Sequence, residues 1–240
     1  SVELIGAESQ FGANAQISNC RELVLKIAAK HPEAVGIGIM LKEAVGLGLA
    51  TPPGLSGFAG ARPSPSPVVR LFSFALPKGT AQIEVEIDGV THQVPDSPGQ
   101  CFDPQKLERP TAPAAPSDAT VPVPLIKLAW GRSGDKGDKA NVGIIARRPE
   151  YLPYIHAALS EQAVADCFAH FLPAQAAGKT ASYVDRYLMP GSHGINFLIH
   201  DVLGGGGMAS IRNDAQGKGY GQILLALSIP VSAEIAEQLK

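Results

Sequence analysis

Long hydrophobic runs, abundant cysteine and an excess of charge of one sign are all missing from this sequence. Its apolar stretches are interrupted by Gly, Pro or charged residues before they reach the roughly 18 residues that a transmembrane helix needs. Residues 1–6 have neither a basic flank nor an apolar segment with a cleavage site, so they do not form a signal peptide. We therefore expect a soluble, cytoplasmic protein.

Charge and cysteine content narrow the class further. The formal net charge of −2 gives no basic field to hold nucleic acid or an anionic membrane surface, so neither is expected as a partner. The cysteines, Cys20, Cys101 and Cys167, are widely spaced and form no CxxC pair. Because they fit neither a disulfide framework nor a zinc site, we expect reduced thiols and no metal.

The apolar residues that are present predict two folded pieces. They make up 45% of the chain, which is enough for one large or two small cores. Residues 95–123 are rich in Pro and Ala without apolar periodicity, and predict a protease-sensitive linker between residues 1–94 and residues 124–240. The pattern predicts an α/β chain of the α+β type, with a sheet that has helices on one face after the linker and a mixed α/β fragment before it.

Periodicity and turn residues predict the individual elements. Before the linker they predict a helix at residues 21–30 and strands at residues 2–5, 68–75, 82–87 and 90–94, the last two joined by an Asp88-Gly89 turn. After it they predict strands at residues 125–130, 141–146, 182–188, 208–213 and 220–229, and helices at residues 149–159, 161–172 and 195–203, with a last helix capped by Ser232. A start on a strand without Met indicates a fragment, or a terminus made by cleavage at Ser1.

The segment between the first two strands after the linker is dense in charge and glycine. It contains Arg132, Ser133, Gly134, Asp135, Lys136, Gly137, Asp138 and Lys139, and ends at Asn141. Its glycines would let backbone N–H groups converge on an anion beside the basic side chains, whereas the two Asp could hold a divalent cation or move a proton. A solvated turn whose charges neutralise one another explains the same residues equally well.

A second segment combines two histidines with four consecutive glycines at residues 204–207. On the predicted helix 195–203, Asn196 and His200 share one face and His193 lies near the start. Each His could be a ligand or a proton carrier, although a structural, hydrogen-bonded role is more common. The order helix, glycines, strand excludes a dinucleotide-binding loop, so Gly205 and Gly206 predict a tight turn or the close approach of a backbone, ligand or subunit.

Two stretches carry a resemblance to a known family. AWGRSGDKGDKANVGIIAR (residues 129–147) and VDRYLMPGSHGINFLIHDVLGGGGMASIRNDAQGKGYGQILL (residues 184–225) resemble the C-terminal ferredoxin-fold domain of the AtuA-like, acyclic terpene utilisation family. Residues 1–94 resemble the end of the larger N-terminal domain of that family, through VELIG and RPSPSPVVRLFSF. Most of that N-terminal domain is absent from the chain, so a site built from it cannot be read here.

The resemblance implies a catabolic protein that acts on branched or acyclic acids as coenzyme A thioesters. Hydration or lyase chemistry would suit Asp135, Asp138, His193 and His200 as proton carriers. Ligand binding would use Arg132, Ser133, Gly134, Lys136, Gly137, Lys139, Asn141, Asn196, Gly205 and Gly206. Expected partners are the small-molecule substrate, the remainder of the N-terminal domain or a companion subunit, and further copies in a homo-oligomer. The rival hypothesis is a non-catalytic oligomerisation or docking module, since one fold hosts many functions.

Overall fold

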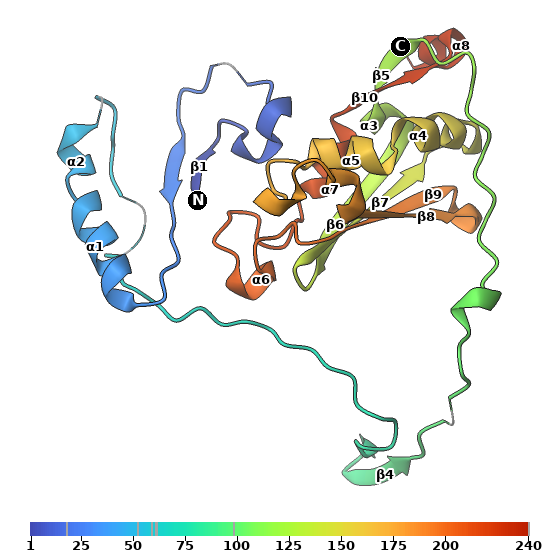
Figure 1. Ribbon diagram of the computed structural model, residues 1–240, viewed down its shortest axis with the longest axis horizontal. Coiled ribbons are helices and arrows are strands. Elements are labelled where there is room, and N and C mark those ends of the chain that lie inside the picture. Colours follow the sequence, from blue (N-terminus) through green and yellow to red (C-terminus); the bar gives the residue numbers. More distant parts are fainter. Residues whose placement is uncertain (18, 52, 59, 61, 98, 240) are drawn as a thin grey trace. The chain divides into compact units, whose positions relative to one another are not determined.

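The computed structural model describes residues 1–17, 19–51, 53–58, 60, 62–97 and 99–239. They form two compact units, residues 1–70 with 112–240 and residues 71–111. In chain order the elements of Figure 1 are β1 (Val2–Ile5), the 3-10 helix η1 (Ser9–Asn14), β2 (Val24–Ile27), α1 (Ala34–Ala44), α2 (Leu47–Ala50), β3 (Ile83–Ile87), β4 (Val90–Val94), η2 (Pro104–Lys106), β5 (Val121–Pro124), α3 (Leu125–Leu128), β6 (Ala129–Lys136), β7 (Lys139–Ala146), η3 (Pro149–Tyr151), α4 (Leu152–Ala158), α5 (Glu161–Cys167), η4 (Ala174–Ala176), η5 (Thr180–Tyr183), β8 (Val184–Met189), η6 (Pro190–Ser192), β9 (Gly194–Ile199), α6 (Gly206–Ala209), α7 (Tyr220–Leu225), β10 (Ser228–Val231) and α8 (Ala233–Gln238).

The centre of the first unit is a four-stranded antiparallel sheet in the order β6-β7-β9-β8. Residues alternate along its strands, so that Val142, Ile144, Phe197 and Ile199 are fully buried on one face. Helices α5 and α7 pack over that face (Figure 1), and stacked Phe168 and Tyr220 rings, 5.0 Å apart, contribute to the core. The prediction of an α+β sheet with helices on one face is confirmed.

A smaller two-stranded sheet of β5 and β10 continues the core at one end of the unit. Val123 and Val231 are buried there, and α8 begins after it. The predicted cap of α8 is confirmed, because the Ser232 hydroxyl accepts a hydrogen bond from the Ile235 N–H at 3.2 Å. The predicted helix opened by Pro149 is confirmed as η3 followed by α4.

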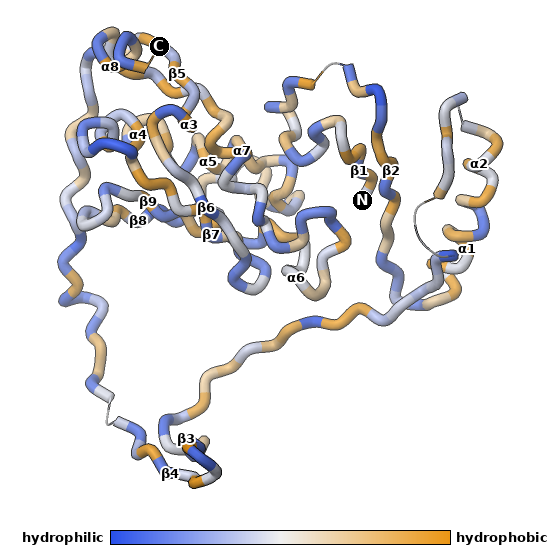
Figure 2. Tube along the Cα trace, turned by 180° about the vertical axis from the view of Figure 1, so that it is seen from behind, coloured by the Kyte–Doolittle hydropathy of each residue, from blue (hydrophilic) through white to orange (hydrophobic). Residues whose placement is uncertain are grey.

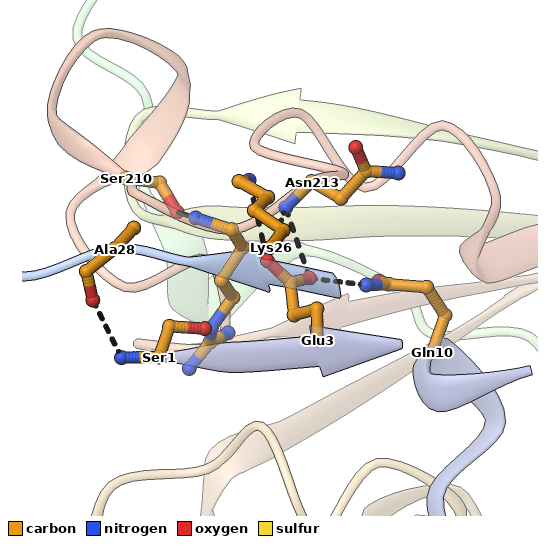
Figure 3. Close-up of polar contacts among 8 residues, drawn as sticks. Ser1, Glu3, Gln10, Lys26, Ala28, Ser210 and Asn213 are labelled. Atoms are coloured by element: carbon orange, nitrogen blue, oxygen red, sulfur yellow. Dashed lines mark hydrogen bonds and ion pairs between the residues drawn. The ribbon is translucent and has the colours of Figure 1, made fainter. Parts of the chain in front are cut away.

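The N-terminal strand pair of β1 and β2 is attached to this unit through one carboxylate. Both oxygens of Glu3 accept hydrogen bonds from the Asn213 N–H at 3.0 Å, Gln10 donates a further bond at 2.6 Å, and Lys26 lies 3.2 Å away (Figure 3). Burial by itself would raise the pKa of Glu3, but the Asn213 and Lys26 interactions outweigh it and lower that pKa. The ionised carboxylate is therefore the form that holds β1 in place.

Several predicted elements before the linker are wrong. Residues 21–30 form no helix; Val24–Ile27 is a strand because it satisfies the backbone hydrogen bonds of β1. Residues 68–75 form no strand in the described structure, and the pattern predicted no element at α1, where a helix is found. The predicted hairpin is confirmed, with Asp88-Gly89 between β3 and β4 in the second unit.

The predictions after the linker fail mainly where apolar residues were assigned the wrong period. Residues 195–203 are not a helix, because Ile195, Phe197 and Ile199 alternate into the core of the central strand β9. Residues 220–229 were predicted as one strand but form helix α7 followed by strand β10. Residues 208–213 form no strand. Residues 125–128, predicted as part of a strand, form the short helix α3. Helix α5 ends at Cys167, before the predicted end at residue 172.

Candidate functional site

The charged segment after Trp130 is not a loop but the paired ends of two strands. Strand β6 runs on to Lys136, which pairs with Lys139 across a two-residue turn of Gly137 and Asp138. Gly137 has φ 67°, a value that favours glycine and allows this tight turn. The segment is therefore a hairpin after all, and strand alternation fixes where each of its side chains lies.

Alternation places most of these polar residues on the sheet face opposite the helices. We call this the open face, because its side chains are exposed or half-buried in the described structure. It consists of Trp130, Arg132 and Lys136 on β6, Lys139, Asn141 and Ile145 on β7, Asn196 and Leu198 on β9 with His200 just after it, and Asp185, Tyr187 and Met189 on β8. Six predicted site residues therefore share one surface: Arg132, Lys136, Lys139, Asn141, Asn196 and His200.

The open face changes from cationic to apolar along the strands. Lys136 and Lys139 lie at the end formed by the hairpin turn, and Arg132 lies two rows further along the same face, beside Gly143. At the other end, Trp130, Ile145 and Met189 lie in one row and are 53%, 44% and 51% exposed. Trp130 at the end of a strand would usually be a core residue, but here it is exposed, and the Arg147 guanidinium lies 4.7 Å from its ring centroid.

Amide and imidazole groups occupy the middle and one corner of the open face. The side-chain amide of Asn141 donates a 2.6 Å hydrogen bond to the side-chain oxygen Oδ1 of Asn196 across the β7–β9 pair. Nε2 of His200 lies 2.8 Å from Asp185 Oδ2, which also accepts a bond from the Tyr187 hydroxyl at 3.4 Å. A carboxylate bound to Nε2 holds the ring proton there, and leaves Nδ1 as the proton acceptor of the neutral ring.

Asp138 and the glycine run meet at the turn of the same hairpin. The Gly205 N–H donates to Asp138 Oδ1 at 2.7 Å, and the Val202 and Leu203 N–H groups donate to the Asp138 carbonyl. A Cβ on Gly206 would lie 2.4 Å from the Gly137 carbonyl oxygen. The close approach predicted for Gly205 and Gly206 is confirmed, as are their left-handed φ values of 107° and 77°.

Two other predicted ligand-binding positions hold the edge of the sheet together. The Ser133 hydroxyl is buried, donates to the Lys218 carbonyl at 3.0 Å and accepts from the Gly221 N–H at 2.8 Å. The Lys218 ammonium lies 3.1 Å from the position of a Cβ on Gly134. Ser133 thus fixes the start of α7. Because Gly134 has no side chain, the Lys218 ammonium can lie at the edge of the open face.

The four predicted catalytic residues do not form one cluster. Asp135 alternates to the helix side of β6, and its carboxylate would lie 3.6 Å from a Cβ on Gly207. His193 is exposed in the turn before β9, whereas His200 follows the end of that strand. Six strand residues separate the two imidazoles by about 20 Å. Asp138 and His200 lie at the hairpin end of the sheet, and His193 lies at the opposite end.

Metal-binding potential is limited in the described part of the chain. No group of three or more His, Cys, Asp or Glu side chains there has the geometry to hold a metal ion.

No described helix is long and apolar enough to cross a membrane.

Sequence reasoning missed the residues that complete the open face. Asp185, Tyr187 and Met189 alternate on the edge strand β8, and Ile145 alternates on β7. Period-two alternation through residues 129–146 and 184–199 was the signal that could have found them. Lys218 had no such signal, because its place beside Gly134 depends on the packing of α7 against β6.

The comparison with known families agrees with this architecture. Residues 123–230 match the model of the AtuA ferredoxin-like domain. Neither a curated protein nor a solved structure matches the chain. The match covers all four strands of the open face and both segments on which the resemblance rested.

Proposed function

We propose, since residues 123–230 match the model of the AtuA ferredoxin-like domain, that the chain binds a branched or acyclic acid as its coenzyme A thioester on the open face. The family provides the general context of acyclic terpene utilisation. The site provides the reason for the thioester, because one surface carries both a cationic end and an exposed apolar end.

The gradient of the open face supports this proposal. A coenzyme A thioester is an anionic nucleotide joined to an amide-containing arm and an apolar acyl group. Lys136, Lys139 and Arg132 would bind phosphate, and the paired amides of Asn141 and Asn196 would bind the arm. The acyl group would cover Trp130 and its apolar neighbours, which removes exposed apolar surface from water.

For the reaction we propose proton transfer of the hydration or lyase type, with His193 as the base. His193 is exposed in the turn before β9, at the same end of the sheet as Trp130, where the acyl group would lie. His200 and Asp138 lie at the opposite, hairpin end, about 20 Å away along β9, so they take no part in proton transfer to the acyl group.

Calorimetric titration with a branched acyl-CoA tests the proposal. Arg132→Ala combined with Lys136→Ala should weaken binding by about 100-fold or more, since charge-assisted bonds to phosphate contribute about 1.5–3 kcal/mol each. Lys179→Ala is the matched control, because Lys179 is exposed in the same domain but lies away from the sheet. Equal affinity in the double variant and the control would contradict the proposal.

His193→Asn tests the chemical step separately. This variant should bind acyl-CoA within about twofold of the parent, because His193 has φ 50° and asparagine tolerates the same left-handed conformation. Turnover of the bound thioester should fall by about 10²–10⁴, the usual contribution of a general base. Full turnover in His193→Asn would remove the histidine from the mechanism.

A second candidate function is assembly through the apolar end of the open face. The exposure of Trp130, Ile145 and Met189 favours it, since contiguous exposed apolar groups often mark a contact surface. The glycine run gives it no support, because its close approach is to Gly137 of the same chain. Sedimentation velocity of Met189→Asp distinguishes the two functions: a shift from oligomer to monomer favours assembly, and an unchanged mass favours the ligand.

The N-terminal region leads to a separate proposal about partners. Figure 2 shows hydrophobic residues along α1 and β2. Their side chains are exposed, for example those of Val35 and Ile39 on α1 and of Val24 and Ile27 on β2. We propose that the remainder of the N-terminal domain, or a companion subunit, covers them. A fluorescent dye that binds apolar surfaces should lose signal when that partner is added.

A further inference from the structure

A cavity of about 480 Å³ lies in the first unit, away from the open face, and its lining is basic. Lys30, His31, Pro32, Val68 and Arg70 line it, so three cationic or ionisable nitrogen-bearing side chains face one space. No carboxylate is among these lining residues. Its volume lies within the range of about 300–1,000 Å³ that is usual for small-molecule sites.

We propose that this cavity binds the phosphorylated adenosine part of the coenzyme A thioester. The choice of nucleotide rests on the proposed function of the open face. The cationic groups would pair with the phosphates, and the Val68 and Pro32 side chains would pack against the base. Arg70 can bind a phosphate through two parallel N–H donors, which a lysine cannot do.

The local structure holds His31 through its Nδ1 atom. Nδ1 lies 3.0 Å from the Glu33 N–H, which can donate to it, and 2.9 Å from the Glu33 carbonyl oxygen, which can accept from it. The ring packs against the first turn of α1, because a Cβ on Gly36 would lie 2.4 Å from Nδ1. In the tautomer that accepts from the Glu33 N–H, and in the protonated ring, Nε2 carries a hydrogen and can donate to a phosphate.

Lys30 connects this cavity to the site on the sheet. Its ammonium donates to the Gly204 carbonyl at 3.2 Å and would lie 3.5 Å from a Cβ on Gly205. The Gly205 N–H in turn binds Asp138, which is followed in sequence by Lys139 of the open face. Lys30 thus lies beside the glycine run, which the Asp138 carboxylate joins to the hairpin turn of the open face, so one elongated ligand could reach from the open face to the cavity.

Adenosine 3′,5′-bisphosphate and an acyl-pantetheine without the nucleotide divide the ligand into its two halves. In calorimetric titrations of the full chain, the bisphosphate should bind alone and compete with acyl-CoA. Arg70→Ala should weaken both bisphosphate and acyl-CoA by about tenfold, the loss of one charge-assisted contact, and leave acyl-pantetheine unchanged. Lys42→Ala, on α1 but outside the cavity lining, is the matched control.

Arg70→Ala carries this test because no hydrogen bond or ion pair of its side chain is found in the described structure, whereas Lys30→Ala also removes the bond to Gly204. No binding of the bisphosphate, with equal affinity of the parent and Arg70→Ala for acyl-CoA, would overturn the nucleotide site and leave the open face as proposed. Failure of acyl-pantetheine to bind, with Arg70-dependent binding of the bisphosphate, would instead overturn the open face alone. Competition by inorganic phosphate as strong as that by the bisphosphate would overturn the assignment to a nucleotide.

Discussion

Residues 112–240 and residues 1–111 differ in whether they can bury their own apolar side chains. The first region contains every buried apolar residue of the described structure, from Val123 to Ile235. In the second, Glu3 is the only described residue that is buried, and it is a carboxylate. Since burial of apolar surface is the main favourable term in folding, the two regions should have very different stabilities.

The difference also explains where chemistry can be placed. The core behind β6, β7 and β9 holds the strands of the open face in place. It therefore fixes the positions of the six predicted site residues on that face, as a binding site requires. The N-terminal region contributes only Lys30 and Arg70 to the proposed nucleotide cavity. Lys30 binds the glycine run there through the Gly204 carbonyl.

The largest effect should come from separating the two regions. A fragment of residues 112–240 should unfold cooperatively on heating, because it keeps the whole core, whereas a fragment of residues 1–111 should show no transition by circular dichroism. Limited proteolysis of the full chain should cleave within residues 95–120 and release the stable piece. A cooperative transition in the fragment of residues 1–111 would break the comparison.

Gly206→Ala should cause the next largest change. Its left-handed φ costs a non-glycine residue about 1–2 kcal/mol, and the contact with the Gly137 carbonyl adds strain, so a loss of about 2–4 kcal/mol in the free energy of unfolding is expected. Gly207→Ala is the control, because the atoms nearest to its Cβ would belong to side chains, Gln216 at 3.3 Å and the Asp135 carboxylate at 3.6 Å. Denaturant unfolding that ranks the two variants equally would contradict this packing.

Glu3→Gln should have a smaller effect that depends on pH. The lowered pKa of Glu3 means that docking of β1 is stabilised above the ordinary pKa of about 4.3, and that this contribution is lost as pH falls through the lowered value. Near neutral pH the variant should lose about 1–2 kcal/mol, and the difference from the parent should vanish in acid. Thermal melts of Glu3→Gln and of the exposed control Glu22→Gln across pH 3 to 7 measure this.

Thiol reactivity should show the same contrast with no change in stability. Burial raises the pKa of Cys167 to about 12, whereas Cys101 in the N-terminal region is exposed. A thiol reagent at pH 8 should label Cys101 within minutes and Cys167 only after unfolding. Rapid labelling of Cys167 in the native protein would show that the core opens readily.

The sequence predicted the class of the fold better than its elements. Alternation identified β3 and the region of β7, and capping residues located α8, because these signals are local. Strand β9 was predicted as a helix, since a run such as Ile195–Ile199 fits both periods until its neighbours β7 and β8 are known. Strand β2 was missed for the same reason, because only pairing with β1 decides its conformation.

The candidate site was predicted as a set of residues but not as a surface. Asn196 and His200 were predicted to share one face of a helix. Residues four apart on a strand also share a face, so the two were correctly grouped although the element is a strand. His193 and Asp135 were grouped by sequence proximity alone, and the sheet separates them. Long-range packing, such as that of Lys218 over Gly134, leaves no trace in local pattern.

Trp130 provides the most direct measurement of the central claim, because it is the only tryptophan in the chain and lies at the apolar end of the open face. If a branched acyl group covers this residue, titration with acyl-CoA should shift its emission to the blue and saturate with the affinity measured by calorimetry. Free coenzyme A should bind more weakly and leave the emission unchanged, since it lacks the acyl group. Saturable binding of acyl-CoA with no change in Trp130 emission would contradict the assignment of the open face as the site.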